Sequence, residues 1–287
     1  MDKKALLLKP FHTIGIGVTF SPNLKANVFE ASRLALLFQS KLTLIHVGEE
    51  SSEKIEKFKS LLAPFISQAL EYDIVFKTGD PVDVILSVST EKKIDLLILG
   101  ALKQENFLKY YVGSIARKIT RQAKCSVLLL IKPSVERLPC SHVVVNGLKD
   151  PKTEKTIASA FFVANALGAE KITIVEEITQ DKITTKVDDD KSLRKANIVK
   201  ERLKLRETAR VNNIIKNIPV DHTKDIVIKS QPIFGTKGYS IGHYAQIARA
   251  DLLIMNAPSK MTFWDRLFPH DIEHILTELP TDVLIIQ

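Results

Sequence analysis

An internal repeat constrains this fold more than any other feature of the sequence. Residues 251–287 align without a gap on residues 95–131, at a constant offset of 156 residues. In each copy an aspartate precedes an apolar run, a longer and more polar segment follows, and a second apolar run ends the copy. A chain of 287 residues has room for about two domains. The repeat therefore predicts two copies of one supersecondary arrangement.

Apolar runs alternate with helical patterns along the first half of the chain. Ser21 and Pro22 are typical of a helix N-cap and a first helical position, and Gly79–Pro81 indicates another helix start. Runs that are apolar on both faces and alternate with helices are typical of a parallel sheet with helices on either side. The expected strands are 12–18, 41–47, 72–77, 94–99 and 126–131, and the expected helices begin near residues 21, 51, 79 and 115.

The segment Lys132–Pro139, with a proline near each end, is the expected linker between the copies. We accordingly expect one domain over residues 1–134 and another over 140–287. The second copy is longer because of an insertion near residues 178–217, which contains the charged run Lys191–Asn217 with apolar residues at helical spacing. This run predicts a long surface helix, and a partner-binding arm is the alternative. Further strands are expected at 141–145, 172–175 and 225–229.

The net charge of +8 lies mostly in the first copy, where residues 1–138 carry 20 Lys and Arg against 14 Asp and Glu. This excess suits an anionic ligand. The lysines are dispersed, however, and no nucleic-acid-binding motif is present, so we expect a solvated basic surface and no specific nucleic-acid partner. No apolar run approaches the ~20 residues of a membrane span, and the N-terminus lacks a signal-peptide pattern. With only Cys125 and Cys140, the sequence favours a cytoplasmic location and no membrane partner.

An apolar run, a mostly polar loop and a Gly-Ser helix start follow one another over residues 96–114. The first turn of a helix has unpaired backbone N–H groups and partial positive charge, and a glycine lets a phosphate approach the backbone. Gly113 and Ser114 are therefore candidate phosphate ligands. The structural alternative is that Ser114 is an N-cap and Gly113 is present for conformational reasons. In parallel sheets a ligand lies beyond the carboxyl ends of the strands. The expected strand ends at this edge are Thr19, Val47 and Gly100.

Other constellations favour neither an enzyme nor a metal site. Ser240–His243 is reminiscent of a nucleotidyltransferase signature, but the first histidine of that signature is missing. His270 and His274 lie four residues apart on an expected helix, and two ligands do not make a zinc site. The sequence has no nucleophile elbow, phosphate-binding lysine loop or paired carboxylates. No catalytic residue is assigned, and slow ATP hydrolysis is the most that we expect.

Six motifs, in this order along the first half, resemble the universal stress protein family. They are Val18–Pro22, Lys41–Val47, Gly79–Pro81, Asp95–Gly100, Val112–Ser114 and Cys125–Leu130. The second half resembles the same family through the ungapped C-terminal match, so the chain is similar to a tandem member. The resemblance implies an α/β fold of two Rossmann-like, adenine nucleotide alpha hydrolase-like domains. Each would be a five-stranded parallel sheet of order 3-2-1-4-5 flanked by helices, and the fifth strands would pair the two domains. The resemblance is also compatible with two chains forming a homodimer.

Some members of this family bind ATP or AMP, so the resemblance implies a nucleotide site in the first domain. The ATP-binding members carry a glycine, two residues, a second glycine, nine residues and then Gly-Ser or Gly-Thr. This chain keeps that spacing, but Lys103 replaces the second glycine, where it either blocks the site or gives a phosphate a charge-assisted contact. Thr19 stands where ATP binders tend to have Asp. The residues of the implied site are Thr19, Val47, Gly100, Lys103, Gly113, Ser114 and Ile115.

In the second domain the aligned positions are Asn256, Ser259, Pro269 and His270. Proline donates no N–H group, so the phosphate cradle is expected to be lost there. Two functions follow from the residues and the resemblance. One is a stress-response protein whose first domain senses a nucleotide. The other is a scaffold in which both pockets are degenerate and a surface binds another protein.

Overall fold

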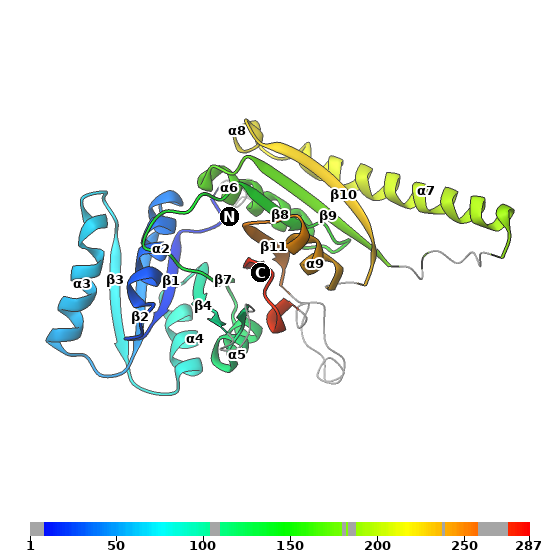
Figure 1. Ribbon diagram of the computed structural model, residues 1–287. Helices are drawn as coiled ribbons and strands as arrows, with labels where there is room; N and C mark the ends of the chain where they lie inside the picture. Colours follow the sequence, from blue (N-terminus) through cyan, green and yellow to red (C-terminus); the bar gives the residue numbers. More distant parts are fainter. Residues whose placement is uncertain (1–8, 104–109, 180–181, 183–187, 237–238, 258–274) are drawn as a thin grey trace.

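The computed structural model of the protein describes residues 9–103, 110–179, 182, 188–236, 239–257 and 275–287 (Figure 1). Ten strands form one continuous sheet in the order β10-β9-β8-β11-β12-β7-β4-β1-β2-β3. The strands from the first half of the chain are β1 (Thr13–Val18), β2 (Lys41–Val47), β3 (Tyr72–Lys77), β4 (Leu96–Gly100) and β7 (Ser126–Leu130). Those from the second half are β8 (His142–Asn146), β9 (Lys171–Thr179), β10 (Val227–Gly235), β11 (Leu252–Asn256) and β12 (Asp282–Ile286).

Each half of the sheet has the strand order 3-2-1-4-5, and all neighbours within a half are parallel. The halves meet where β7 and β12 pair antiparallel, with Leu128 opposite Leu284. The fold class expected from the sequence is confirmed, and so is the pairing of the two copies through their fifth strands. All described strands of the main sheet lie within residues 13–130 or 142–286, on either side of the expected linker.

Helices cover both faces of the sheet and divide the core into two layers. One layer lies under α2, α3, α6 and α7, and the other lies under α4, α5 and α9. The strands supply both layers because alternate side chains point to opposite faces. The helices are α2 (Leu24–Leu37), α3 (Ser52–Ile66), α4 (Pro81–Glu91), α5 (Ser114–Gln122), α6 (Thr153–Leu167), α7 (Asp190–Ile215), α8 (Val220–Thr223) and α9 (Tyr239–Ile247). Among the described residues, no helix combines the length and apolar character needed to cross a bilayer.

Two equivalent aspartates show the repeat in three dimensions. Asp95 Oδ2 accepts the backbone N–H groups of His12 (2.9 Å) and Thr13 (3.1 Å), where β1 begins. Asp251 Oδ2 accepts those of Ser141 (2.8 Å) and residue 142 (2.9 Å), where β8 begins. Both carboxylates therefore tie the start of the fourth strand of their domain to the start of the first.

Three phenylalanines join the domains on the α2 and α6 face. Between ring centroids, Phe11 lies 5.7 Å from Phe38, the C-cap residue of α2, and 6.4 Å from Phe162 of α6. Phe38 and Phe162 are themselves 5.5 Å apart. Since Phe11 is only 2% exposed, its side chain packs between a helix of each domain. The two domains thus share a core as well as a sheet.

The start of α2 differs from the prediction. We expected Ser21 to cap the helix, but the helix begins at Leu24 and Asn23 occupies the N-cap position. Ser21 instead lies in a turn, where its N–H donates to Thr19 O (2.8 Å) and its carbonyl accepts the N–H of Leu24 (3.0 Å). These backbone bonds hold Ser21 and Pro22 ahead of the first helical turn. The start at Gly79–Pro81 was predicted correctly, because Asp80 caps α4 and Pro81 is its first residue.

Strands β9 and β10 are longer than the sequence indicated. The predicted strands ended at Val175 and Lys229, whereas the observed strands continue to Thr179 and Gly235. The extension includes two glutamates, Glu176 and Glu177, that are 2% and 5% exposed. Charged residues interrupt the apolar pattern on which a strand prediction depends. The insertion forms α7 as predicted, and this helix projects from the body of the molecule along β10 (Figure 1).

Candidate functional site

Three of the predicted site residues lie at the ends of neighbouring parallel strands. Gly100 ends β4, Thr19 follows β1 and Val47 ends β2, and these strands are adjacent in the order β4-β1-β2. Thr19 and Gly100 are exposed, and Val47 is half-buried. The fold therefore places the three residues along one edge of the sheet, where ligands of doubly wound folds bind.

Asn27 lies directly beneath this edge. Its side-chain amide atoms are 3.7 Å from the point that a Cβ of residue 100 would occupy. Its Oδ1 atom is buried and, within the described structure, accepts no hydrogen bond. Sequence reasoning missed Asn27, because a polar residue one turn into α2 gives no sign that it faces the strand end. An unpaired acceptor in this position is available to an N–H or O–H donor that comes close to Gly100.

A small hairpin connects Gly100 with the start of α5. Strand β5 (Leu102–Lys103) pairs antiparallel with β6 (Tyr110–Tyr111), and Lys103 lies opposite Tyr110. The sequence predicted a polar loop here, since the pairs on either side of the turn are too short to give a strand pattern. The side chain of Lys103 and residues 104–109 lie outside the described structure. The assignment of Lys103 to the site stays a prediction.

Gly113 is the N-cap residue of α5, and Ser114 is its first helical residue. The helix thus begins one residue earlier than predicted, and the structural explanation of Ser114 as N-cap is wrong. Gly113 has φ −60° and ψ 162°, a conformation open to any residue, so the backbone there does not require glycine. No side chain caps the helix start in the described structure. Ser114 and Ile115 are exposed, and their N–H groups belong to the unpaired first turn.

The electrostatics of α5 favour an anion at its first turn. The first turn contains no acidic residue, and the helix carries Arg117, Lys118 and Arg121. Its macrodipole adds partial positive charge at the N-terminal end. Leu276 of the second domain holds this end in place, because its carbonyl accepts the N–H of Val112 (3.1 Å) and Nη2 of Arg117 (3.1 Å). The start of α5 is therefore positioned by both domains.

An aromatic cluster lies beside Thr19 and Val47. Phe20 is 48% exposed and stacks on Phe58 of α3, with ring centroids 5.2 Å apart. The buried His46 packs edge-on against Phe20 (5.2 Å) and Phe76 (5.5 Å), and its Nδ1–H donates to the carbonyl of Val18 (3.1 Å). The cluster closes the sheet edge on the α3 side. Sequence reasoning missed it, because its four rings come from four separate elements.

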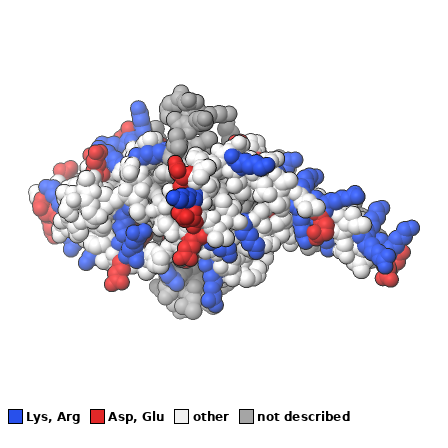
Figure 2. All heavy atoms as spheres, turned by 90° about the horizontal axis from the view of Figure 1, so that it is seen from above, with Lys and Arg blue, Asp and Glu red and all other residues white. Residues whose placement is uncertain are grey.

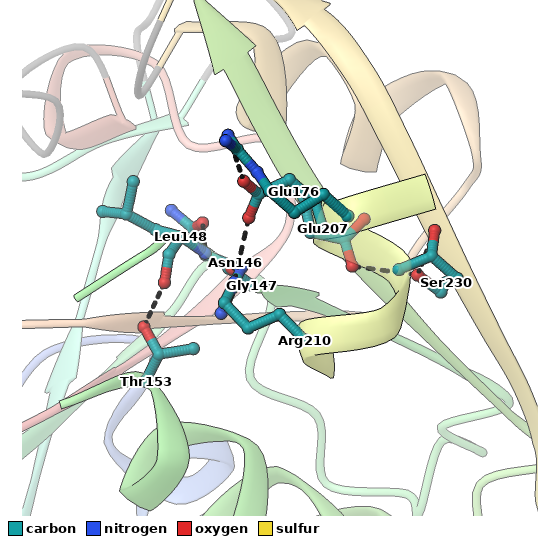
Figure 3. Close-up of polar contacts among 10 residues, drawn as sticks. Asn146, Gly147, Leu148, Thr153, Glu176, Glu207, Arg210 and Ser230 are labelled. Carbon is teal, nitrogen blue, oxygen red and sulfur yellow. Dashed lines mark hydrogen bonds and ion pairs between the residues drawn. The ribbon is translucent and has the colours of Figure 1, made fainter. Parts of the chain in front are cut away.

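The same edge of the second domain is filled by protein side chains (Figure 3). Asn256 aligns with Gly100, and its Nδ2 donates to Oγ1 of Thr153 at the start of α6 (3.0 Å). Thr153 Oγ1 in turn donates to the carbonyl of Leu148. The N–H of Leu148 donates to Oδ1 of Asn146 (3.0 Å). Most polar groups at the ends of β8 and β11 are thus bonded to one another, and the buried Oδ1 of Asn256 is left without a hydrogen bond in the described structure.

Arg210 of α7 completes this filling. By strand register Gly147 corresponds to Val18. The carbonyl of Val18 accepts the Nδ1–H of His46, whereas the carbonyl of Gly147 accepts an N–H from Nη2 of Arg210. Arg210 Nε also donates to Glu207 Oε2 (2.9 Å), as the sticks in Figure 3 show. The position of His46 is taken by Glu176, whose Oε1 accepts the hydroxyl of Ser230 (2.9 Å). Burial is the main cause that raises the pKa of Glu176 to about 7.

The remaining polar motifs form no further site. No group of three His, Cys, Asp or Glu side chains able to hold a metal ion occurs within the described ranges. The aligned positions 259, 269 and 270, and the second histidine, His274, lie outside the described residues. His243 of α9 packs on Tyr239, with ring centroids 6.3 Å apart. Cys125 and Cys140 are free thiols, and burial raises their pKa values to about 11 and 12.

The fold and the strand-end site define the class of this protein. It is a tandem pair of doubly wound α/β domains. The first copy has exposed residues, Thr19 and Gly100, at its strand-end edge, and side chains of the second copy fill the corresponding edge.

Comparison with known proteins agrees with this class. The model of the universal stress protein family matches residues 10–130. A universal stress protein from Methanocaldococcus jannaschii is 28% identical over 92 residues, which cover 31% of this chain. The match spans 50% of the length of that curated relative. The resemblance of the first half to the universal stress protein family is confirmed, and the second half repeats the same fold.

Two solved structures share the fold over nearly the whole chain. A protein of unknown function from Pseudomonas aeruginosa PAO1 has a TM-score of 0.70 at 13% identity, covering 98% of this chain and 94% of its own. A universal stress protein from Archaeoglobus fulgidus DSM 4304 has a TM-score of 0.63 at 16% identity, covering 96% of this chain and 98% of its own. Similarity at this identity establishes the two-domain fold of the chain.

Proposed function

We propose that the first domain binds an adenine nucleotide, ATP or AMP, and that the protein acts in stress adaptation as a nucleotide-responsive sensor. The phosphates would lie against the first turn of α5, at Gly113, Ser114 and Ile115. The nucleoside would lie along the strand ends at Thr19, Val47 and Gly100. No catalytic role is assigned to any residue, so the function proposed is binding rather than turnover.

The observation that carries this proposal is that α5 begins after its N-cap residue Gly113 with unpaired N–H groups and no side-chain cap. Gly113 has a backbone conformation open to any residue, and Ser114 is not the helix cap. Because glycine has no side chain, it leaves space for a phosphate to approach the unpaired N–H groups at the positive end of the helix. The absence of acidic residues from the first turn of α5 supports the same conclusion.

Gly113→Val tests the site. Valine is compatible with the φ and ψ values of residue 113, so the helix start should survive. Its two methyl groups would occupy the space of the phosphates and remove about two charge-assisted hydrogen bonds. We expect ATP and AMP affinity, measured by isothermal titration calorimetry, to fall about 100-fold or more. The circular dichroism spectrum should not change.

A matched control perturbs another helix start of the same domain. The Ser51 side chain caps α3 and accepts the N–H of Lys54 (3.3 Å). Ser51→Ala should lower stability by about 1 kcal/mol and leave nucleotide affinity unchanged. Nucleotide binding by Gly113→Val equal to that of the wild type would refute the assigned site.

Lys103→Gly separates the two roles that a lysine could have in this position. The variant restores the glycine of the ATP-binding pattern. Weaker binding of ATP would assign Lys103 a phosphate contact, and tighter binding would assign it an obstructing role. Comparison with AMP locates the effect, because a contact to the terminal phosphate is lost only for ATP.

A second candidate function rests on the outer face of α7. This 26-residue helix carries eight Lys and Arg against three Asp and Glu. Its face opposite the packed residues Ala196 and Val211 presents Ile198 (53% exposed) and Leu205 (69% exposed), seven residues apart. Arg194 and Arg202 are exposed on the same face, and Figure 2 shows basic side chains along this projecting helix. Apolar anchors at this spacing are typical of a helix that docks into the groove of a protein partner.

If α7 is a partner-binding arm with an acidic partner, its function does not depend on nucleotide. Ile198→Ser combined with Leu205→Ser should then abolish partner binding, and it should leave stability and nucleotide affinity unchanged. Arg202→Glu should weaken binding through charge, and Lys118→Glu on α5 is the matched control. Stress-related activity that survives the α7 changes and is lost in Gly113→Val favours the sensor.

A further inference from the structure

A cavity lies between the two domains, away from the strand-end edge. Its volume is about 340 Å³, which is within the range of about 300–1,000 Å³ found for small-molecule sites. Helix α2 of the first domain forms one wall and α6 of the second domain forms the other. The sheet around the β7 and β12 pair is the floor, and the linker between the domains crosses the remaining side. The cavity exists only because the two copies pair.

Most of the cavity surface is aliphatic or aromatic. The wall residues are Leu34 of α2, Phe38 at its C-cap, and Val163 and Leu167 of α6. The floor residues include Leu96, Leu128, Leu130, Leu252 and Leu284. Exposed residues of the lining, among them Leu138 and Pro139 of the linker, mark where it meets solvent. An apolar lining of this kind favours an occupant with an apolar body.

One carboxyl group faces this apolar space. Asp282 is the first residue of β12, and its Oδ1 accepts the N–H of Ile131 (2.8 Å). In the described part of the chain its second oxygen, Oδ2, makes no hydrogen bond and no ion pair. Burial is the main cause that raises the pKa of Asp282 to about 7, and the charges of Glu30 and Asp251 add to the effect. Among the described residues, no cation contributes to the pKa of this group.

The other charged groups around the cavity have partners elsewhere. Glu30 pairs with Arg33, whose guanidinium also donates to the carbonyls of Ser134 and Val135 and so fastens the linker to α2. Asp251 accepts the backbone N–H groups at the start of β8. Lys132 also lines the cavity, on its solvent side, and the thiol of Cys140 faces the cavity with a pKa raised to about 12 by burial. Within the described lining, Asp282 is the carboxyl group that has neither an ion pair nor a second hydrogen bond.

We propose that this cavity binds a small organic molecule with an apolar body and one protonated amine, and that the ammonium group donates to Oδ2 of Asp282. Glu30 and Asp251 repel an anion from this position, so carboxylates and phosphates are excluded. The apolar walls would not replace the water shell of a metal ion. The site is independent of the nucleotide site proposed for the first domain.

The test compares three ligands of one size: hexylamine, hexanol and hexanoate. Titration at pH 8, followed by calorimetry and by changes in NMR chemical shift, should give one hexylamine per chain. We expect hexanol to bind about tenfold more weakly and hexanoate not to bind. Between pH 8 and pH 6 hexylamine affinity should fall about tenfold, because Asp282 takes up a proton over that interval.

Asp282→Asn keeps an acceptor for the N–H of Ile131 and removes the charge. It should reduce hexylamine affinity about tenfold, to the level of hexanol. Asp73→Asn removes a surface carboxylate that pairs with Lys41 on the far edge of the sheet, and it should have no effect. Val163→Phe fills the cavity from α6 and should abolish binding of both hexylamine and hexanol.

Absence of hexylamine binding to the wild-type protein would overturn the proposal. So would hexylamine affinity that is unchanged in Asp282→Asn and in Val163→Phe. Equal affinity for hexylamine and hexanoate would also overturn it, because the cavity would then select the apolar body alone. Nucleotide titration of the same variants should give the wild-type result.

Discussion

Replacing Glu176 by glutamine measures the cost of burying one carboxyl group in the second domain. Glu176 is 2% exposed, its Oε2 has no partner within the described structure, and its pKa is raised from 4.5 to about 7. A raised pKa in the folded state stabilises the fold below the unfolded-state pKa, and this stability is lost as the pH rises through about 7. At 1.36 kcal/mol per pKa unit, the difference between pH 4 and pH 8 is about 3 kcal/mol.

Glutamine removes this pH dependence while its Oε1 still accepts the Ser230 hydroxyl. We expect Glu176→Gln to raise the free energy of unfolding at pH 8 by up to about 3 kcal/mol, and to change it little at pH 4.5. Urea unfolding at the two pH values measures the difference between variant and wild type. Because Asp282 titrates equally in both proteins, its contribution cancels. Glu170→Gln, at an exposed position of the same domain, is the control and should change neither value.

A gain that is equal at pH 4.5 and pH 8 would refute this reasoning, because the effect would then come from packing and not from charge. A loss of stability at pH 8 would also refute it. In that case the attraction between ionised Glu176 and Arg210 would outweigh the cost of burial.

Two further changes test the shared core and a predicted helix start. Phe11→Ala removes the ring that packs between Phe38 and Phe162, and urea unfolding should show a loss of about 3–5 kcal/mol; a loss below 1 kcal/mol would mean that Phe11 does not join the domains. Asp80→Ala removes the carboxylate that accepts the N–H of Val82 (2.9 Å), and stability should fall by about 1 kcal/mol. In this second case, an unchanged unfolding free energy would contradict the capping role.

The sequence determines the fold of this chain well because its signals are periodic and occur twice. Alternating apolar runs and helical patterns locate the strands, and the constant offset predicts the duplication. Single residues are less informative. Ser21 and Pro22 have the pattern of a helix start, yet backbone bonds within a turn delay α2 to Leu24. At this position, hydrogen bonds formed in the folded chain outweigh the local preference of Ser21 and Pro22 for a helix start.

The long strand β9 shows where a pattern cannot suffice. Glu176 and Glu177 interrupt the apolar run, but both are buried. Their stabilising partners, the Ser230 hydroxyl and the N–H of Ile241 (2.7 Å), lie more than fifty residues away in the sequence. The sequence shows that Glu176 and Glu177 are charged, but only the folded structure shows the groups that bond to them.

The candidate site divides in the same way. Gly113 and Ser114 could be found because a Gly-Ser pair before a helix has a physical meaning of its own. Asn27 and the ring of Phe20 could not, because their roles come from neighbours on other elements. The filled edge of the second domain depends on Arg210 of α7, which bonds to Gly147. The corresponding helix of the first domain, α3, has 15 residues, whereas α7 has 26. The assignment of the nucleotide-binding residues stays a prediction.

The stoichiometry of bound nucleotide tests the central claim most directly. The purified protein would be denatured, and the released small molecules identified and quantified by mass spectrometry, before and after saturation with ATP or AMP. The site proposed in the first domain and the filled edge in the second predict one adenine nucleotide per chain. Two nucleotides per chain would contradict the filled second edge, and none after saturation would contradict the sensor.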